Sequence, residues 1–136
     1  MLGEPNLDPG GGVFSRKVAA MSEADYVARG HDGLVRAARL DGNDIWAASL
    51  SLSAPFAVHR GASSLVAGSN PTWRDMLYKL QIRRTIIFGE SFLPDNPDAK
   101  RLPQVGVNVG VVPGAGHSMA WENPAGLASA VRHALP

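Results

Sequence analysis

Three stretches of the first eighty residues predict helices, and apolar positions recur at helical spacing in the first and the third of them. They cover residues 23–40, 55–67 and 71–80. Ser22, with Asp25 three positions later, forms a capping-box pattern before the first stretch, and Pro55 suits the first turn of the second. Residues 1–12 carry two prolines and three consecutive glycines and predict a loop.

The pattern changes in the second half of the chain. RTIIFG, residues 84–89, is a continuous β-branched and aromatic run ended by glycine, which is typical of a strand buried on both faces. VNVGVVP, residues 107–113, predicts a second strand, and a short helix is expected between them around 97–102. Asn123 and Pro124 then open a closing helix. This order predicts a parallel βαβα unit with a right-handed crossover.

These patterns predict an α/β fold with a helical region over 1–82 and a βαβα region over 83–136. Two parallel strands alone would leave open hydrogen-bonding edges, and parallel sheets are normally covered on both faces. Either a stretch such as DIWAASLSLS, residues 44–53, is a strand rather than a short helix or loop, or the sheet is completed elsewhere. We expect completion by another chain or by self-association.

Composition narrows the classes of function. The 136 residues are 45% hydrophobic and 18% charged, which is typical of a globular domain. The formal net charge is +1 and the basic residues are scattered, so we expect neither nucleic acid nor a membrane surface as a partner. The pair Arg83 and Arg84 predicts solvated strand flanks.

The chain contains no cysteine, which excludes disulfides and thiolate nucleophiles and favours a reducing compartment. We expect a cytoplasmic protein, because no run is long enough to span a bilayer and the first residues lack the pattern of a signal peptide. The four histidines show no HxxxH or HExxH spacing, so we expect no metal and no other cofactor.

The segments RRTIIFGE and GAGHSMAWENPAGLASAVRHAL resemble the C-terminal end of an α/β-hydrolase. In that family a late strand ends in glycine followed by acidic residues, and the next strand ends in a loop that presents the catalytic histidine. A helix often opened by Asn-Pro follows. The matching residues here are Gly89-Glu90, Gly114-Ala115-Gly116-His117 and Asn123-Pro124. The preceding helical region resembles the mobile lid that these enzymes insert before their last two strands.

The resemblance implies that His117 is the general base of a catalytic triad. The acid that orients this base commonly lies three residues after the strand-ending glycine, where the chain carries Phe92 and departs from the pattern. Asp95 is the preferred acid because its loop can fold back toward the histidine, and Glu90 is the second candidate. The acid could also come from the half of the fold that the chain does not contain.

The family's nucleophile elbow, G-x-S-x-G, does not occur. GASSLVAG holds Ser63 and Ser64, but it lacks the spacing and a preceding strand, so both serines are interpreted as helix-packing residues. His31 and His59 fall in the helical region and are expected at the surface, and His133 is expected to have a structural role in the last helix.

Four apolar residues could line a pocket for an acyl or alkyl group. They are Trp46, Phe56, Met119 and Trp121. The leading hypothesis is the C-terminal part of an α/β-hydrolase acting on an ester, lactone, amide or similar small apolar substrate, inactive without a complementary N-terminal half that carries the nucleophile. The alternative is a truncated, non-catalytic hydrolase remnant that acts as a dimerisation or partner-binding module through its open strand edge.

Overall fold

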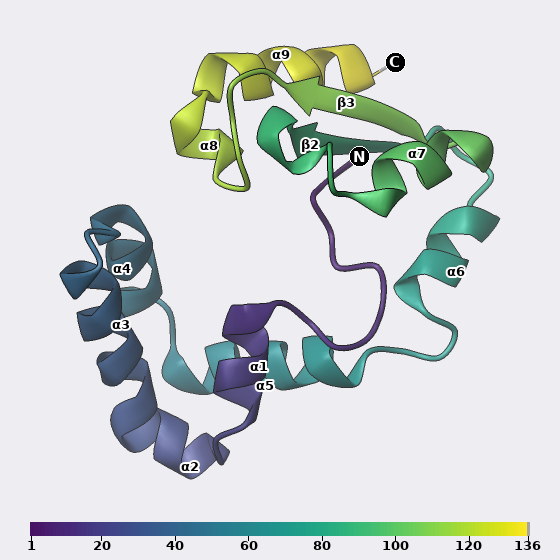
Figure 1. Ribbon diagram of the computed structural model, residues 1–136. Helices are drawn as coiled ribbons and strands as arrows, with labels where there is room; N and C mark the ends of the chain where they lie inside the picture. The colour runs from purple at the N-terminus through teal and green to yellow at the C-terminus, as the bar shows by residue number, and fades with distance from the viewer. Residues whose placement is uncertain (136) are drawn as a thin grey trace. The chain divides into compact units, whose positions relative to one another are not determined.

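The computed structural model describes residues 1–135, which divide into two compact units (Figure 1). A sheet unit contains residues 1–5 and 74–135, and a helical unit contains residues 6–73. The division therefore falls between Trp73 and Arg74, whereas the sequence pattern placed it after residue 82. The first five residues belong to the sheet unit.

The helical unit begins with a loop and continues as a series of helices. These are α1 (Val13–Ala19), α2 (Glu23–Asp25), the π-helix η1 (Tyr26–Gly30), α3 (His31–Leu40), α4 (Asp44–Ser51) and α5 (Pro55–Ala67). The helix predicted over 23–40 is confirmed as the continuous run from α2 to α3, and the Ser22 hydroxyl accepts the Asp25 N–H at 3.0 Å. The stretch DIWAASLSLS is helical and supplies no strand.

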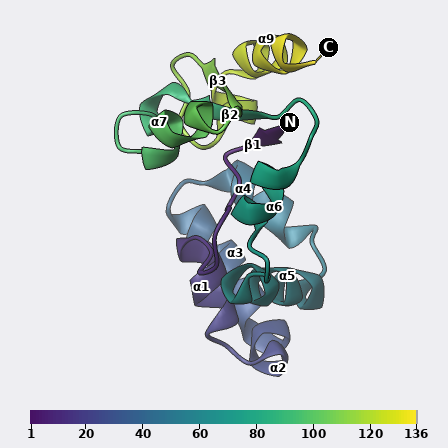
Figure 2. The same cartoon turned by 90° about the vertical axis from the view of Figure 1, so that its right-hand side faces the viewer.

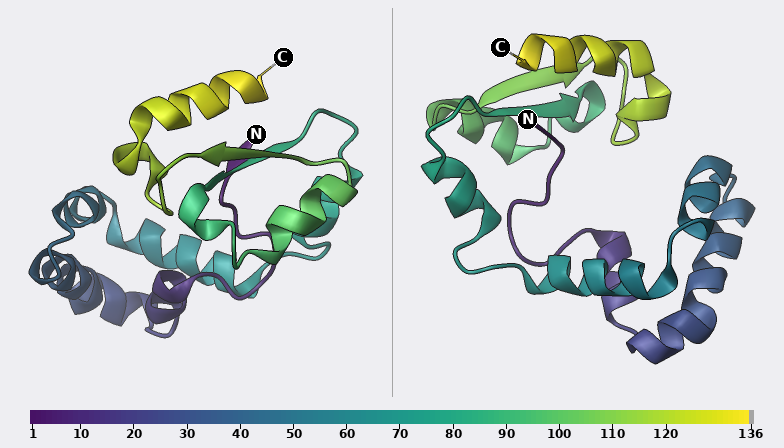
Figure 3. Two further views of the ribbon diagram at one scale, coloured as in Figure 1. Left: turned by 45° about the horizontal axis from the view of Figure 1, so that its top comes forward. Right: turned by 180° about the vertical axis from the view of Figure 1, so that it is seen from behind.

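Two buried clusters form the core of this unit. One joins α3 to α4 through Val35, Ala38, Ala47 and Leu50. The other joins α1, η1 and α5 through Val18, Tyr26 and Ala62. Phe14 and Leu34 pack against both clusters, and α3 and α4 lie side by side (Figure 3).

The two histidines of this unit are buried, so the expectation that they lie at the surface is wrong. His31 is 4% exposed and its Nε2 donates to the Leu50 carbonyl at 3.0 Å. His59 is 9% exposed and its Nε2 donates to the Met21 carbonyl at 2.8 Å. Both rings flank Tyr26, with centroids 5.8 Å from its ring. Backbone carbonyls satisfy the ring N–H groups and so permit their burial.

The sheet unit is built on three parallel strands in the order β1-β2-β3 (Figure 2). The strands are β1 (Leu2–Gly3), β2 (Thr85–Gly89) and β3 (Asn108–Val112). The helices around them are α6 (Trp73–Lys79), the 3₁₀ helix η2 (Glu90–Phe92), α7 (Pro97–Gln104), α8 (Met119–Glu122) and α9 (Pro124–Ala134). The predicted βαβα order is confirmed, and Asn123 caps α9 by accepting the Gly126 N–H.

The strand β1 corrects the expectation that the first residues form a loop. Leu2 lies opposite Ile86 and Gly3 opposite Ile87, and the Glu4 N–H donates to the Ile87 carbonyl at 3.0 Å. A strand of two residues is too short to show the alternation or the apolar run by which strands are found in a sequence.

Helices cover the two faces of the sheet. α9 lies on one face and α7 on the other (Figures 1 and 2). The core beneath α9 contains Ile87, Val112, Ala115 and Met119. Every residue of β2 is buried, which accounts for its unbroken apolar sequence. Within residues 1–135, no helix has the length and apolar character needed to cross a bilayer.

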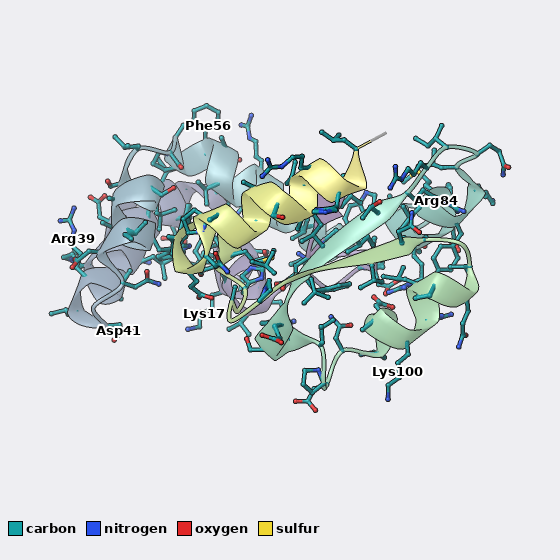
Figure 4. All side chains as sticks on the ribbon, turned by 90° about the horizontal axis from the view of Figure 1, so that it is seen from above. Lys17, Arg39, Asp41, Phe56, Arg84 and Lys100 are labelled. Atoms are coloured by element: carbon teal, nitrogen blue, oxygen red, sulfur yellow. The ribbon has the colours of Figure 1, made fainter. Side chains whose placement is uncertain are left out.

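Arg84 connects three parts of the sheet unit and is not the solvated flank that the sequence predicted. It lies immediately before β2 (Figure 4). Its guanidinium donates to the carbonyls of Leu77 and Tyr78 in α6 and to those of Val105 and Gly106 before β3. These bonds satisfy carbonyls at the end of α6, which helix geometry leaves without partners.

Candidate active site

His117 lies in the loop between β3 and α8, at the carboxyl end of the parallel strands. Its side chain is 71% exposed, so the ring is accessible. In open α/β sheets ligands bind beside the carboxyl ends of the strands. The position of His117 is therefore suited to chemistry on a bound molecule.

The loop before His117 is tied to the segment after β2. The Ser91 N–H and hydroxyl both donate to the Ala115 carbonyl, at 3.1 and 3.2 Å. Gly89 has to be glycine, because a Cβ there would lie 2.1 Å from the Gly116 carbonyl oxygen. Asn123 also donates to the Pro113 carbonyl at 2.8 Å. These contacts fix the backbone that presents the imidazole.

The carboxylate that contacts His117 belongs to Glu4. Glu4 Oε2 lies 2.5 Å from His117 Nδ1, across 113 residues of sequence. The other oxygen, Oε1, accepts the Gly89 N–H at 2.7 Å. The Glu4 side chain is only 5% exposed, and both of its oxygens are engaged. A buried carboxylate is retained in this way when it is fully hydrogen-bonded.

The Glu4 contact sets the tautomer of the ring. An ionised carboxylate only accepts hydrogen bonds, so Nδ1 of His117 carries the hydrogen. In the neutral ring Nε2 then has a free lone pair. Among residues 1–135 no group bonds this nitrogen, so it can take a proton from a molecule bound beside the ring.

The backbone at Glu4 is unusual. Its φ is +34°, the one positive value at a non-glycine residue within residues 1–135. A side chain in the left-handed region costs about 1 kcal/mol. Such strain is characteristic of functional sites, and here it accompanies the turn of the carboxylate toward Gly89 and His117.

The two carboxylates selected from the sequence occupy other positions. Glu90 accepts the Gly114 N–H at 2.7 Å, so it holds the loop rather than the imidazole. Asp95 lines a hollow of about 440 Å³ with Ser91, Phe92 and residues 96–97, and it makes no bond with His117. The structure brings neither Glu90 nor Asp95 to Nδ1, where Glu4 lies.

Phe92 stands where the family pattern places the acid, and it contacts the histidine ring. The two ring centroids are 5.7 Å apart at an interplanar angle of 38°. Phe92 also lines the hollow beside Asp95. An aromatic side chain at this position packs against the imidazole and makes no hydrogen bond with it.

The candidate substrate-binding residues fall in both units. In the helical unit, Trp46 packs edge-to-face on Phe14 at 5.0 Å and lines a groove of about 340 Å³ between α1, α3 and α4. Phe56 is 51% exposed on α5, beneath the Arg60 guanidinium. In the sheet unit, Met119 belongs to the buried core, whereas Trp121 is 49% exposed on α8.

Within residues 1–135 no serine hydroxyl bonds Nε2 of His117. Ser63 and Ser64 lie in α5, as their helical interpretation predicted. In the same residues no three His, Cys, Asp or Glu side chains gather as metal ligands. The described site is thus an exposed imidazole held at Nδ1 by a buried carboxylate.

The sequence patterns did not indicate Glu4. The strand before it is two residues long, and the glutamate is followed by proline in a stretch rich in loop-forming residues. The available signal was an acidic residue directly after an apolar–glycine pair, which is too common to select a residue.

No protein-family model matches the chain, and neither the curated proteins nor the solved structures gave a match.

Proposed function

We propose that the chain is the C-terminal part of an α/β-hydrolase and contributes the base and the acid of a catalytic triad. His117 is the base, Glu4 is the acid, and a complementary N-terminal half carries the nucleophile. The substrate class is a small apolar ester, lactone or amide. The observation that carries this proposal is the buried Glu4 carboxylate held against Nδ1 of an exposed histidine at the carboxyl end of parallel strands.

The chemistry follows from the roles of the two side chains. As the nucleophile's hydroxyl attacks the substrate carbonyl, His117 Nε2 takes the hydroxyl proton. The Glu4 carboxylate stabilises the imidazolium through Nδ1–H. The imidazolium then gives its proton to the leaving alkoxide or amine, and an acyl group remains on the nucleophile. A water molecule, deprotonated by the same nitrogen, releases the acid and regenerates the hydroxyl.

The outer edge of β1 is the attachment point in this proposal. Glu4 directs its N–H to β2, so the backbone groups of Gly3 face away from the sheet. Leu2 is 44% exposed at the same edge. A parallel strand added there would cover the open edge, and its carboxyl end would lie beside Glu4.

The proposal is tested by joining the chain to an N-terminal α/β-hydrolase half that contains a G-x-S-x-G elbow and assaying a short-chain nitrophenyl ester. We expect turnover only when both parts are present. His117→Ala and Glu4→Gln should each lower kcat by a factor on the order of 10⁴, because each removes a triad member.

Asp95→Asn and Glu90→Gln provide matched carboxylate-to-amide controls. Asp95→Asn should leave kcat within about twofold of the parent, since Asp95 makes no bond with His117. Glu90→Gln should have a smaller effect than Glu4→Gln, because Glu90 acts on Gly114. Undiminished turnover in His117→Ala would refute the mechanism. A large loss in Asp95→Asn with none in Glu4→Gln would assign the acid to Asp95.

A further inference from the structure

The outer edge of β3 is open. The Asn108 N–H donates to the Arg84 carbonyl, so alternate residues from Asn108 bond β2. Val109 and Val111 therefore direct their backbone N–H and C=O groups away from the sheet. In the sheet unit no strand lies beyond β3, which forms the side of the sheet opposite β1 (Figure 2).

This edge lacks the features that usually prevent strands from pairing between molecules. β3 contains no charged residue and no proline, and Val111 is 39% exposed. A groove of about 450 Å³ separates the edge from α9, where Gly126 and Ala130 present little side chain. An incoming strand is thus not obstructed by the helix that covers this face.

The edge is complementary to itself. An antiparallel copy centred on Gly110 places Val109 opposite Val111 of the second copy, and Val111 opposite Val109 of the second copy. Both residues point outward, so each pairing is of the hydrogen-bonded type and closes two N–H···O bonds. The twofold operation uses the same backbone groups on both copies, as a closed dimer requires.

The charges at the two ends of β3 favour the same arrangement. At its amino end lies Arg83, whose guanidinium donates to the His133 and Leu135 carbonyls. At its carboxyl end lie Glu90 and Glu122, which accept the N–H groups of the loop after β3. An antiparallel copy brings the basic end of β3 in one molecule toward the acidic end of β3 in the other. Each chain has a formal net charge of only +1, so the overall repulsion between two copies is small.

The geometry points to a homodimer in which two copies of this chain pair through β3 and join their sheets across Gly110. This interface is independent of the proposed hydrolase assembly, which uses the β1 edge. The dimer forms without an N-terminal half and without catalysis.

Sedimentation equilibrium of the purified chain tests the dimer. We expect twice the monomer mass of 14.3 kDa for the wild type and the monomer mass for Val111→Lys. Val105→Lys is the matched control, because Val105 is 37% exposed in the same unit but lies outside β3. It should remain dimeric. Circular dichroism reports whether each variant is folded.

Single cysteines test the register, since the chain has none of its own. Gly110→Cys places the sulfurs of the two copies directly opposite each other, so mild oxidation should yield a disulfide-linked dimer. The new Cβ would lie 3.2 Å from Ile87 Cγ1, so the Ile87 side chain has to shift slightly. Val111→Cys should not cross-link, because its diagonal copy lies about 7–8 Å away, beyond the reach of a disulfide.

Three results would overturn the dimer. The first is a monomeric wild-type chain, which excludes the dimer even if Val111→Lys fails to fold. The second is equal cross-linking of Gly110→Cys and Val111→Cys. The third is a dimer abolished by Leu2→Lys at the β1 edge but retained in Val111→Lys, which would transfer self-association to the other edge. None of these results affects the Glu4 and His117 roles.

Discussion

Glu4 shows how one residue connects the beginning of the chain to its end. Its carboxylate bonds Gly89 on β2 and His117 after β3, so the turn after β1 is joined to the turns after both other strands. The sequence-based preference for Asp95 rested on a loop that could fold back toward the histidine. Parallel strands bring all their carboxyl ends to one edge of the sheet, and an acid after any of them can reach the histidine.

At the same scale, we expect a substitution of Tyr26 to stabilise the fold. Its side chain is fully buried, and within residues 1–135 its hydroxyl has no hydrogen-bond partner. Tyr26→Phe keeps the ring and removes the unpaired hydroxyl, so the free energy of unfolding should rise by about 1 kcal/mol. Urea denaturation followed by circular dichroism measures it. A loss of stability would show that the hydroxyl is satisfied in solution.

The pH dependence of Tyr26 provides a second readout for the same variant. Burial raises the pKa of the Tyr26 phenol above its ordinary value of 10.0. The unfolded chain therefore loses this proton at a lower pH than the folded chain. The protonated Tyr26 phenol makes its full contribution to the free energy of unfolding below pH 10.0. That contribution is lost as the pH rises toward the pKa of the phenol in the folded chain. Wild-type stability should consequently fall more steeply there than that of Tyr26→Phe.

At the scale of elements, the two glycines within the run from α2 to α3 differ in their surroundings. A Cβ on Gly33 would meet nothing within 4 Å, whereas a Cβ on Gly30 would lie 2.8 Å from Met21 Cε and 2.9 Å from Tyr26 Cδ2. Gly33→Ala should raise the free energy of unfolding by about 0.5–1 kcal/mol, since alanine is the better helix former.

Gly30→Ala is the matched comparison. Its methyl group collides with the buried Tyr26 ring, so it should give no gain or a loss of about 1 kcal/mol. Thermal melts of both variants test the pair. Equal gains from the two alanines would mean that the packing around η1 is looser than described.

Helices and strands were predictable where a few neighbouring residues form a known pattern, such as a cap or an apolar run. The buried run of β2, the Ser22 cap and the Asn-Pro start of α9 each report their structure within a few residues. β1 was not predictable, because two residues carry no period and the strand exists only through pairing with β2. The burial of His31 was hidden for a similar reason: its carbonyl partner lies on α4.

The same contrast applies to the candidate site. The loop that presents His117 is a local pattern of glycines before a capped helix, so it could be recognised in the sequence. The Glu4 contact is not local and could not be recognised. Asp95 was preferred because its loop could fold back toward His117, whereas Glu4 lies 113 positions from the histidine.

At the scale of the whole molecule, the sheet unit depends on long-range backbone capping by Arg84. Its guanidinium donates to four carbonyls, and none of these bonds survives truncation of the charged group. Arg84→Met should lower the free energy of unfolding by about 2–4 kcal/mol. Hydrogen exchange of the β2 and β3 amides measures the loss.

Arg83→Met is the control for that experiment. Arg83 is exposed and donates to two carbonyls at the end of the last helix. Its loss should cost about 1 kcal/mol or less. Equal effects from the two arginines would show that Arg84 does not have the special role described for it.

The proposed function requires that Glu4 and His117 form an acid–base pair within this chain. Nitrogen-15 NMR of histidine-labelled protein, at a pH where the ring is neutral, reads the His117 tautomer directly. The wild type and Asp95→Asn should carry the hydrogen on Nδ1, with Nε2 bare, because Glu4 accepts from Nδ1. Glu4→Ala should release this preference and move the hydrogen to Nε2. A wild-type ring protonated on Nε2, or a tautomer that changes with Asp95→Asn and not with Glu4→Ala, would contradict the pair.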